Sequence, residues 1–491
     1  MSRKNIFLSF LLVAAIAISS LSYLKFTGDK SWTLDKFNSQ RLDWKDCYGG
    51  FECSSFKVPV DYEKISNETF TLKVLRHSAS DKQKRLGAIF VNPGGPGGSA
   101  TDYAYNAESI VSSEISSRFD IIGFDPRGIN SSEPIRCLTN REEDEFLSAD
   151  ASGGDPKKIR ELIRISRAFA AKCEKAAGSK LGHYSTLEAA KDMEVLRNLL
   201  KEKNLNYLGK SYGTYLGTLY AALYPQSVGR MVLDGAVAPN ITLREQELAQ
   251  AFGFDKALDN YLSSQDKFKM KDVTKLIERA SSKPLKSESG RLATESLVIT
   301  AIAQSLYDSK SGWNELTKAL ELALEKRNPA GILELADRYN NRDSSGSYYS
   351  NQNDISIMIT CLDWREKRTV NQMASEQAIF KSKSSVFGPY LSFAGLPCKY
   401  WKANPKLLKF DLSKIDTKPI LVIGVTQDPA TPYKWAQVLS KSFRNAELLT
   451  LKGEGHTGHN RGNKCVDSAV DTYFLTGKIP SKGLICAQSG N

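Results

Sequence analysis

The sequence predicts an α/β protein in which a doubly wound, mostly parallel sheet carries an inserted helical cap. Six apolar, β-branched segments end in glycine-rich turns, at residues 87–98, 119–128, 206–213, 230–237, 418–428 and 446–456. Continuous apolar runs of this kind are typical of strands that are buried on both faces of a parallel sheet. Helical patterns lie between the segments, and this alternation indicates strands that are joined through helices within one sheet.

Two of the connecting helices have ends that can be read from the sequence. Residues 186–203 follow a helical pattern that Ser185 or Thr186 opens as the N-cap. Residues 214–225 follow a second pattern, which Pro225 stops because proline cannot continue a helix.

The alternation breaks between about residues 240 and 415. Long amphipathic patterns such as 311–327 and a polar loop at 340–354 take its place before strands resume. We therefore expect a helical cap over the carboxyl edge of the sheet. The predicted organisation is a signal peptide or N-terminal anchor (1–25), the first part of the core (26–240), the cap insertion (241–415) and the second part of the core (416–491).

The amino terminus has the layout of a secretory signal. Arg3 and Lys4 precede an apolar run over residues 6–18, and small residues follow it. Further apolar side chains up to Phe26 extend the run, so a retained membrane anchor is the alternative to a cleaved signal. We expect an exported protein, secreted, periplasmic or in the cell envelope, whose membrane association is limited to this segment.

The eight cysteines form an even set, which export allows to pair as disulfides. Eight cysteines permit 105 connectivities. Their order favours the local pairs Cys47–Cys53, Cys137–Cys173, Cys361–Cys398 and Cys465–Cys486. A zinc site is the rival interpretation, but the sequence has no CxxC pair, and His456 and His459 have no cysteine beside them. We expect neither a metal nor a cofactor.

The net charge does not indicate a nucleic-acid partner. The 491 residues include 67 Lys and Arg against 55 Asp and Glu, for a formal charge of +12. The basic residues are dispersed among acidic ones, without a long unmixed run or the aromatic signature of an RNA-binding module. The composition is otherwise that of an ordinary globular protein.

The chemistry begins at residues 209–213, which read Gly-Lys-Ser-Tyr-Gly. This GxSxG pattern follows a short predicted strand and opens a predicted helix. A turn this tight requires neighbours without bulk, and it lifts the hydroxyl of Ser211 above the sheet as a nucleophile. As a bare pattern GxSxG is common, so the interpretation depends on the strand and helix around it.

A serine nucleophile needs a base and a carboxylate that orients the base. His456 follows the last predicted strand among small residues, and it is the predicted base, with His459 as the alternative. Asp428 ends the strand before it, in a turn between prolines. The chain order Ser211, Asp428, His456 is the order of α/β-hydrolases.

An oxyanion hole would complete this site. The first N–H is expected from Tyr212, directly after the nucleophile. The second is expected from the glycine-rich turn at 92–98, where we choose Gly95, with Gly94 as the alternative.

Together these motifs resemble a known group, the exported α/β-hydrolase serine aminopeptidases of the tripeptidyl aminopeptidase and prolyl iminopeptidase family. Two positions depart from the family pattern. Asn130 stands where glycine is common, which is tolerable because asparagine accepts a positive φ, and Pro93 replaces the histidine of prolyl iminopeptidases, which favours the tripeptidyl branch. The similar segments are 53–62, 91–99, 124–132, 185–197, 207–217, 231–237, 422–432, 453–457 and the tail 465–486.

The resemblance implies that the enzyme removes short units, expected to be tripeptides, from the free amino end of peptides through an acyl-enzyme. Such an enzyme must hold an α-ammonium group, and a cap carboxylate is the natural means. Asp363, two residues after Cys361, is the predicted anchor, with an ordinary solvated or helix-capping aspartate as the alternative. The alternative functions are a carboxylesterase or lipase-like hydrolase and the single-residue release of a prolyl iminopeptidase.

Overall fold

The computed structural model describes residues 32–150, 155–404 and 410–488. Its centre is a ten-stranded sheet in the order β1-β2-β3-β5-β4-β6-β7-β10-β11-β12. In this order the sheet is parallel from β5 through β4, β6, β7, β10 and β11 to β12. On the other side of β5 it continues through β3, β2 and β1 in antiparallel pairs. The strands are β1 Lys45–Cys47, β2 Phe51–Pro59, β3 Thr69–His77, β4 Gly87–Asn92, β5 Phe119–Phe124, β6 Leu205–Lys210, β7 Val228–Asp234, β10 Ile420–Gln427, β11 Ala446–Glu454 and β12 Ile485–Ala487.

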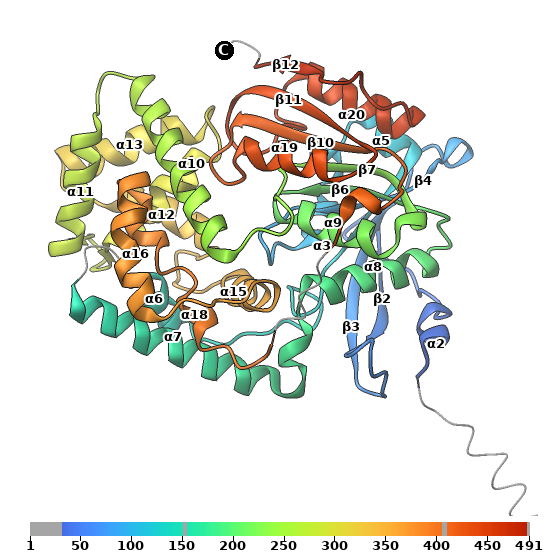
Figure 1. The fold of residues 1–491 in the computed structure, drawn as a ribbon, viewed down its shortest axis with the longest axis horizontal. Coiled ribbons are helices and arrows are strands. Elements are labelled where there is room, and N and C mark those ends of the chain that lie inside the picture. Colours follow the sequence, from blue (N-terminus) through green and yellow to red (C-terminus); the bar gives the residue numbers. More distant parts are fainter. Residues whose placement is uncertain (1–31, 151–154, 405–409, 489–491) are drawn as a thin grey trace, which may run out of the picture.

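Helices cover both faces of this sheet, so the predicted doubly wound class is confirmed (Figure 1). One face packs on α8, α9 and α19, and the other on α3 to α5 and α20, each through its own apolar cluster. Ser185 caps α8 as predicted, through its hydroxyl and the N–H of Glu188. The helices are α2 Leu34–Asn38, α3 Ala100–Tyr105, α4 Ala107–Ile110, α5 Ser113–Arg118, α8 Thr186–Leu199, α9 Tyr212–Leu223, α19 Tyr433–Ser442 and α20 Lys464–Thr476.

The insertion between β7 and β10 is helical and has its own apolar core, to which α10, α12, α13, α14 and α17 contribute. It lies beside the sheet as a second lobe (Figure 1). A short hairpin, β8 Leu285–Lys286 with β9 Leu292–Ala293, belongs to it. Its helices are α10 Leu243–Ser263, α11 Met270–Ser282, α12 Glu295–Leu306, α13 Gly312–Glu325, α14 Ala330–Asn340, α15 Gln352–Asp363, α16 Val370–Lys383, α17 Phe387–Leu391 and α18 Leu396–Lys399.

Two helices that precede the nucleophile also lie against this lobe. They are α6 Asn140–Leu147 and α7 Pro156–Ala177, and both run along the lower edge of the cap in Figure 1. Ile159, Leu162 and Ile163 of α7 pack on the buried Met373 and Leu396 of the cap. The cap is therefore assembled from two separate stretches of the chain.

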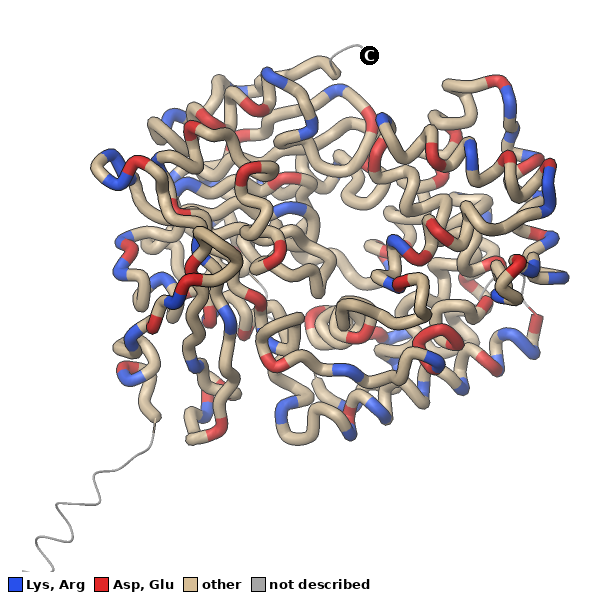
Figure 2. The backbone as a smooth tube through the Cα atoms, turned by 180° about the vertical axis from the view of Figure 1, so that it is seen from behind, with Lys and Arg blue, Asp and Glu red and all other residues tan. Residues whose placement is uncertain are grey.

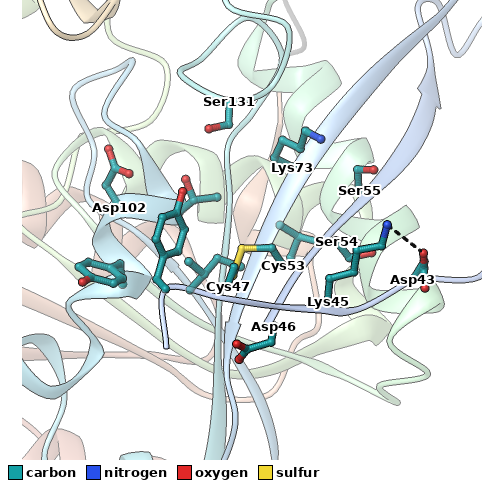
Figure 3. Close-up of a pocket in the computed structure, with 15 residues that line it drawn as sticks. Asp43, Lys45, Asp46, Cys47, Cys53, Ser54, Ser55, Lys73, Asp102 and Ser131 are labelled. Atoms are coloured by element: carbon teal, nitrogen blue, oxygen red, sulfur yellow. Dashed lines mark ion pairs between the residues drawn. A yellow bond between two sulfur atoms is a disulfide. The ribbon is translucent and has the colours of Figure 1, made fainter. Parts of the chain in front are cut away.

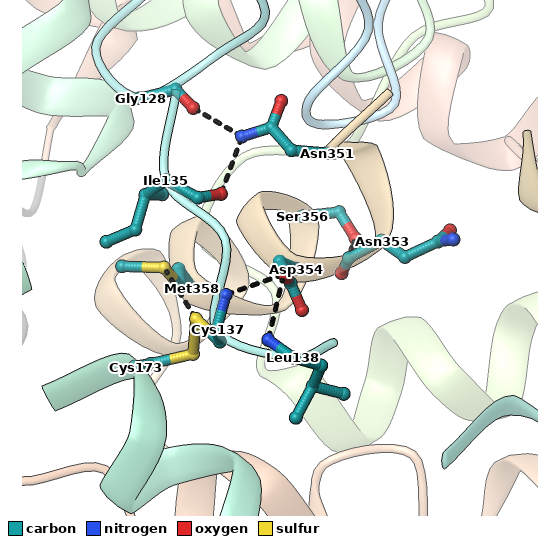
Figure 4. Close-up of a disulfide and its surroundings, with 10 residues drawn as sticks. All are labelled: Gly128, Ile135, Cys137, Leu138, Cys173, Asn351, Asn353, Asp354, Ser356 and Met358. Atoms are coloured by element: carbon teal, nitrogen blue, oxygen red, sulfur yellow. Dashed lines mark hydrogen bonds between the residues drawn. A yellow bond between two sulfur atoms is a disulfide. The ribbon is translucent and has the colours of Figure 1, made fainter. Parts of the chain in front are cut away.

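The structure pairs the cysteines as their order suggested, as Cys47–Cys53, Cys137–Cys173, Cys361–Cys398 and Cys465–Cys486. The second pair ties the segment after β5 to α7, as Figure 4 shows. The start of α15 docks on the same segment, since Asp354 accepts from the N–H groups of Cys137 and Leu138. The disulfide thus stands where core and cap meet.

Basic and acidic residues alternate over both lobes (Figure 2), in keeping with the dispersed charge of the sequence. Within the described ranges, no helix is long and apolar enough to cross a bilayer. The predicted signal or anchor at residues 1–25 lies outside the described residues.

Candidate active site

Ser211 occupies the sharp turn between strand β6 and helix α9. Its backbone has φ 56° and ψ −126°, a strained conformation for a residue with a side chain. Both glycines of the motif are needed for space, because a Cβ on Gly209 would lie 2.5 Å from the carbonyl oxygen of Gly213, and one on Gly213 would lie 2.8 Å from Oδ1 of Asn92. Local packing therefore accounts for the GxSxG spacing, and the geometry is that of a nucleophile elbow.

Asp428 and His456 form a hydrogen-bonded pair at the carboxyl edge of the sheet. Nδ1 of His456 lies 2.9 Å from both carboxylate oxygens of Asp428. Asp428 is only 3% exposed, and it also accepts from Thr431 and from the N–H groups of Ala430 and Thr457. A carboxylate held this firmly fixes the proton of the imidazole on Nδ1, so Nε2 is left as the basic nitrogen.

Ser211 and His456 each lie close to the end of β7. The N–H of Ser211 donates to the carbonyl of Asp234, with an N···O distance of 2.9 Å. At the next residue, Gly235, a Cβ would lie 3.2 Å from Cε1 of His456. The main chain of Ser211 and the ring of His456 thus both lie beside residues 234–235, while Asp428 pairs with Nδ1 of that ring.

His459, the alternative base, has a different environment. It is 2% exposed, and its N–H and that of Gly458 donate to the carboxylate of Asp234. Burial next to the Lys210 ammonium lowers the pKa of His459 to about 3. Asp428 pairs with His456, so the geometry favours His456 as the base.

Lys210 and Asp234 support the loop that carries His456 and His459, a role that the sequence did not predict. Nζ of Lys210 donates to the carbonyl of His459 at 2.7 Å and lies 4.0 Å from Asp234. Burial raises the pKa of Asp234 and lowers that of Lys210. The sequence signal that could have indicated this support was the position of Asp234 at the end of a predicted buried strand.

The glycine-rich turn after β4 packs directly on the nucleophile. A Cβ on Gly94 would lie 2.9 Å from Cβ of Ser211 and 3.2 Å from the nitrogen of Tyr212. The N–H of Gly94 is already donated to Oδ1 of Asn92. Gly95, with φ 113°, follows in a conformation that favours glycine. The turn therefore lies against Ser211 and Tyr212, and because the N–H of Gly94 is already engaged, Gly95 remains the preferred candidate for the second donor.

The neighbouring loop at Arg127 and Asn130 is held by structural contacts. Asn130 has φ 42°, as expected for an asparagine in place of glycine. Arg127 is buried and donates to Asp192 through both Nε and Nη2.

Asp363 ends α15 and is 6% exposed. Its carboxylate accepts from the N–H of Thr186 at 2.9 Å and from the hydroxyl of Thr186, which also contacts the hydroxyl of Tyr212. Asp363 thus caps α8 and connects to the residue after the nucleophile. It also lines a cavity of about 810 Å³ between core and cap, together with Tyr215 and Trp364, whose rings stack at 4.9 Å.

Burial raises the pKa of Asp363 to about 7, against an ordinary value of 3.8. Between these pH values the Asp363 carboxyl is protonated in the folded chain and ionised in the unfolded chain. The free energy of unfolding therefore falls as pH rises from about 4 to about 7. We expect the melting temperature of the wild type, relative to Asp363→Asn, to fall over this range. Scanning calorimetry of both proteins at several pH values checks this, and parallel curves would contradict it.

A second cavity, of about 690 Å³, lies at the antiparallel edge of the sheet (Figure 3). The Cys47–Cys53 disulfide, Lys73 and Asp102 line it. Its lining comes from β1 to β3, α3 and nearby loops and includes none of the three predicted catalytic residues.

One group of residues in the described structure has side chains close enough to hold a metal ion, namely Asp61, His183 and Glu188. Two cations already approach Glu188, with Arg127 at 3.7 Å and Lys191 at 3.5 Å. A metal would compete with both, so we interpret the group as part of an ion-pair network.

Comparisons with known proteins identify relatives of this chain. A family model described as "TAP-like protein" matches residues 384–486. Serine protease Hip1 of Mycobacterium tuberculosis is 30% identical over an alignment of 526 residues, which covers 99% of each chain. Carboxylesterase B of the same species is 34% identical over 455 residues, 89% of this chain and 86% of its own. Tripeptidyl aminopeptidase of Streptomyces lividans is 29% identical over 480 residues, 91% and 86%. The chain therefore belongs to the TAP-like family of α/β-hydrolases and is a serine hydrolase.

Proposed function

We propose that this enzyme cleaves short units, tripeptides above all, from the free amino end of peptides, with Ser211, His456 and Asp428 as its catalytic triad. The observation that carries the proposal is the pairing of His456 Nδ1 with buried Asp428, beside a strained serine at a strand-to-helix turn. A relative named tripeptidyl aminopeptidase supports the peptide substrate.

The reaction follows from these positions. Nε2 of His456 takes the proton of Ser211 Oγ as the oxygen attacks the carbonyl carbon of the substrate. The N–H groups of Tyr212 and Gly95 stabilise the negative oxygen of the tetrahedral intermediate. His456 then gives its proton to the leaving amine as the C–N bond breaks, and water hydrolyses the acyl-enzyme by the same steps.

Asp363 is the proposed partner of the substrate ammonium. Two hydrogen bonds connect it through Thr186 to Tyr212, directly after the nucleophile, and it lines the cavity between core and cap. If it holds the amine, Asp363→Asn slows cleavage of unblocked peptides and leaves ester hydrolysis unchanged. An equal effect on both substrates would assign Asp363 to helix capping alone.

The second candidate function is carboxylester hydrolysis, which the 34% identity to a relative named carboxylesterase B favours. An esterase needs the same triad and no amine anchor. It would hydrolyse simple acyl esters faster than any unblocked peptide.

A panel of fluorogenic peptides with one to four residues, each in amino-free and acetylated form, separates these functions. We expect the unblocked tripeptide to react fastest on the purified protein. Faster hydrolysis of a simple acyl ester than of every peptide would favour the esterase. A preference for a single residue would favour prolyl iminopeptidase-like release.

We also infer that the protein acts outside the cytosol. The four disulfides and the signal-like amino terminus support export, because disulfides persist in oxidising compartments.

A further inference from the structure

A residue of the cap touches the proposed catalytic base. Tyr307 directly follows α12, and its carbonyl accepts a hydrogen bond from the N–H of His456 at 3.0 Å. Its ring also stands edge-on to the imidazole, with centroids 5.2 Å apart and planes at 87°. One cap residue therefore contacts both the main chain and the ring of His456.

The core supports His456 from other directions. Asp428 holds Nδ1, while Asp234 binds the N–H groups of Gly458 and His459 further along the loop. These contacts fix one ring atom and the residues after the histidine. Tyr307 of the cap holds the main-chain N–H of His456 and packs its ring against the imidazole. The position of the imidazole therefore depends on both lobes.

Tyr307 is itself fixed within the cap. Its ring packs near Phe254 of α10 and Tyr339 of α14, at centroid distances of 5.6 and 6.2 Å. Phe254 belongs to the buried core of the cap, and Tyr307 packs against that core. Any movement of the cap relative to the sheet would therefore carry Tyr307 with it.

Arg461 adds a second link between the same two segments. Its guanidinium donates to the Tyr307 carbonyl at 3.3 Å and pairs with Asp308 at 3.1 Å. Lys310 of the cap in turn donates to the carbonyl of Arg461 at 3.2 Å. Half-exposed ion pairs contribute little stability. These contacts therefore serve mainly to fix the position of the cap segment that contains Tyr307 relative to the loop that contains His456 and Arg461.

We propose that Tyr307 is a positioning residue, through which the docked cap sets the orientation of His456. The inference rests on the proposed role of His456 as the base. Catalysis then requires the cap for more than substrate binding, because a catalytic group displaced by about 1 Å can lose about a hundredfold in rate.

The first test replaces the ring and keeps the carbonyl. We expect Tyr307→Ala to lower kcat about tenfold or more with KM changed less than about threefold, since the loss lies in the transition state. Tyr307→Phe, which keeps the aromatic edge, is expected to retain most of the activity. Tyr307→Leu provides a variant that fills the space without an aromatic ring, in case the alanine variant does not fold.

Tyr261→Ala is the matched control. Tyr261 is a buried cap tyrosine that stands edge-on to Trp313 at 5.8 Å, and it lies seven residues along α10 from Phe254, which packs near Tyr307. We expect it to lower the melting temperature at least as much as Tyr307→Ala while kcat stays near that of the wild type. Equal losses of kcat in both variants would mean that Tyr307 only stabilises the cap, and the inference would be wrong.

The decisive measurement repeats Tyr307→Ala in a His456→Ala background, with the rate of acylation by an activated aryl ester as the readout. If Tyr307 acts through His456, the second substitution costs less than about twofold there, since coupled residues are not additive. The same loss in both backgrounds would refute the inference. Full activity of His456→Ala alone would instead refute the proposed triad, so the two failures are distinguishable.

Discussion

Ser211→Ala is expected to abolish turnover of every substrate while leaving the fold intact. The hydroxyl is the atom that bonds to the substrate, and loss of such a group from a serine triad costs on the order of a million-fold in kcat. The alanine also fits the turn, because the strain at φ 56° belongs to the backbone. The measurements are kcat with an unblocked tripeptide substrate and the melting temperature of both proteins.

The control for this variant is labelling by a fluorophosphonate, followed by peptide mapping. The wild type should carry the label on Ser211 and the variant should carry none. A variant that turned over substrate at a rate comparable to the wild type would end the proposed mechanism.

The second large expected effect is the difference in activity between His456→Ala and His459→Ala. His456→Ala should lose activity by several orders of magnitude, since the serine would have no base and Asp428 would have no imidazole to orient. His459→Ala should keep kcat within about tenfold and mainly lower the melting temperature, because it removes a buried ring that lies outside the Asp428 pair.

Purified variants with circular dichroism and steady-state kinetics check this pair. An inactive His459→Ala beside an active His456→Ala would overturn the assignment of the base. Loss of activity in both, with only His459→Ala unfolded, would leave His456 as the base.

Most of the parallel part of the sheet could be predicted because its strands are continuous apolar runs that are largely buried. The six apolar segments all became strands, from Gly87–Asn92 to Ala446–Glu454. The antiparallel edge could not be found in the same way. Strand β2 alternates buried and exposed residues, and β1 is three residues long, too short for any periodicity. The same length hides β12 at the opposite, parallel edge.

The proposed triad residues could be picked out in the sequence because each follows a strand and has glycine or proline nearby. Their supports were not readable, because they come from distant parts of the chain. Tyr307 lies in the cap insertion and reaches His456 only in the folded molecule. Thr186 similarly meets Asp363 across 177 positions, and no local pattern indicates that contact.

The cap also contains more of the chain than its predicted range of 241–415. Helix α7 is amphipathic in sequence, but amphipathicity does not say which lobe its apolar face meets. In the structure the first half of that face packs on α16 and α18 of the cap, whereas Phe169, Cys173 and Ala177 belong to the apolar cluster on the sheet.

The measurement that tests the proposed function most directly compares kcat/KM for one tripeptide substrate with a free amino end and for its acetylated twin. Acetylation removes the charge of the amine and leaves the anchoring carboxylate without its partner, so we expect a loss of at least about a hundredfold. A short acyl ester should still be hydrolysed slowly through the same serine. Equal kcat/KM for the free and acetylated peptides would contradict amine recognition and point to a general esterase or an endopeptidase.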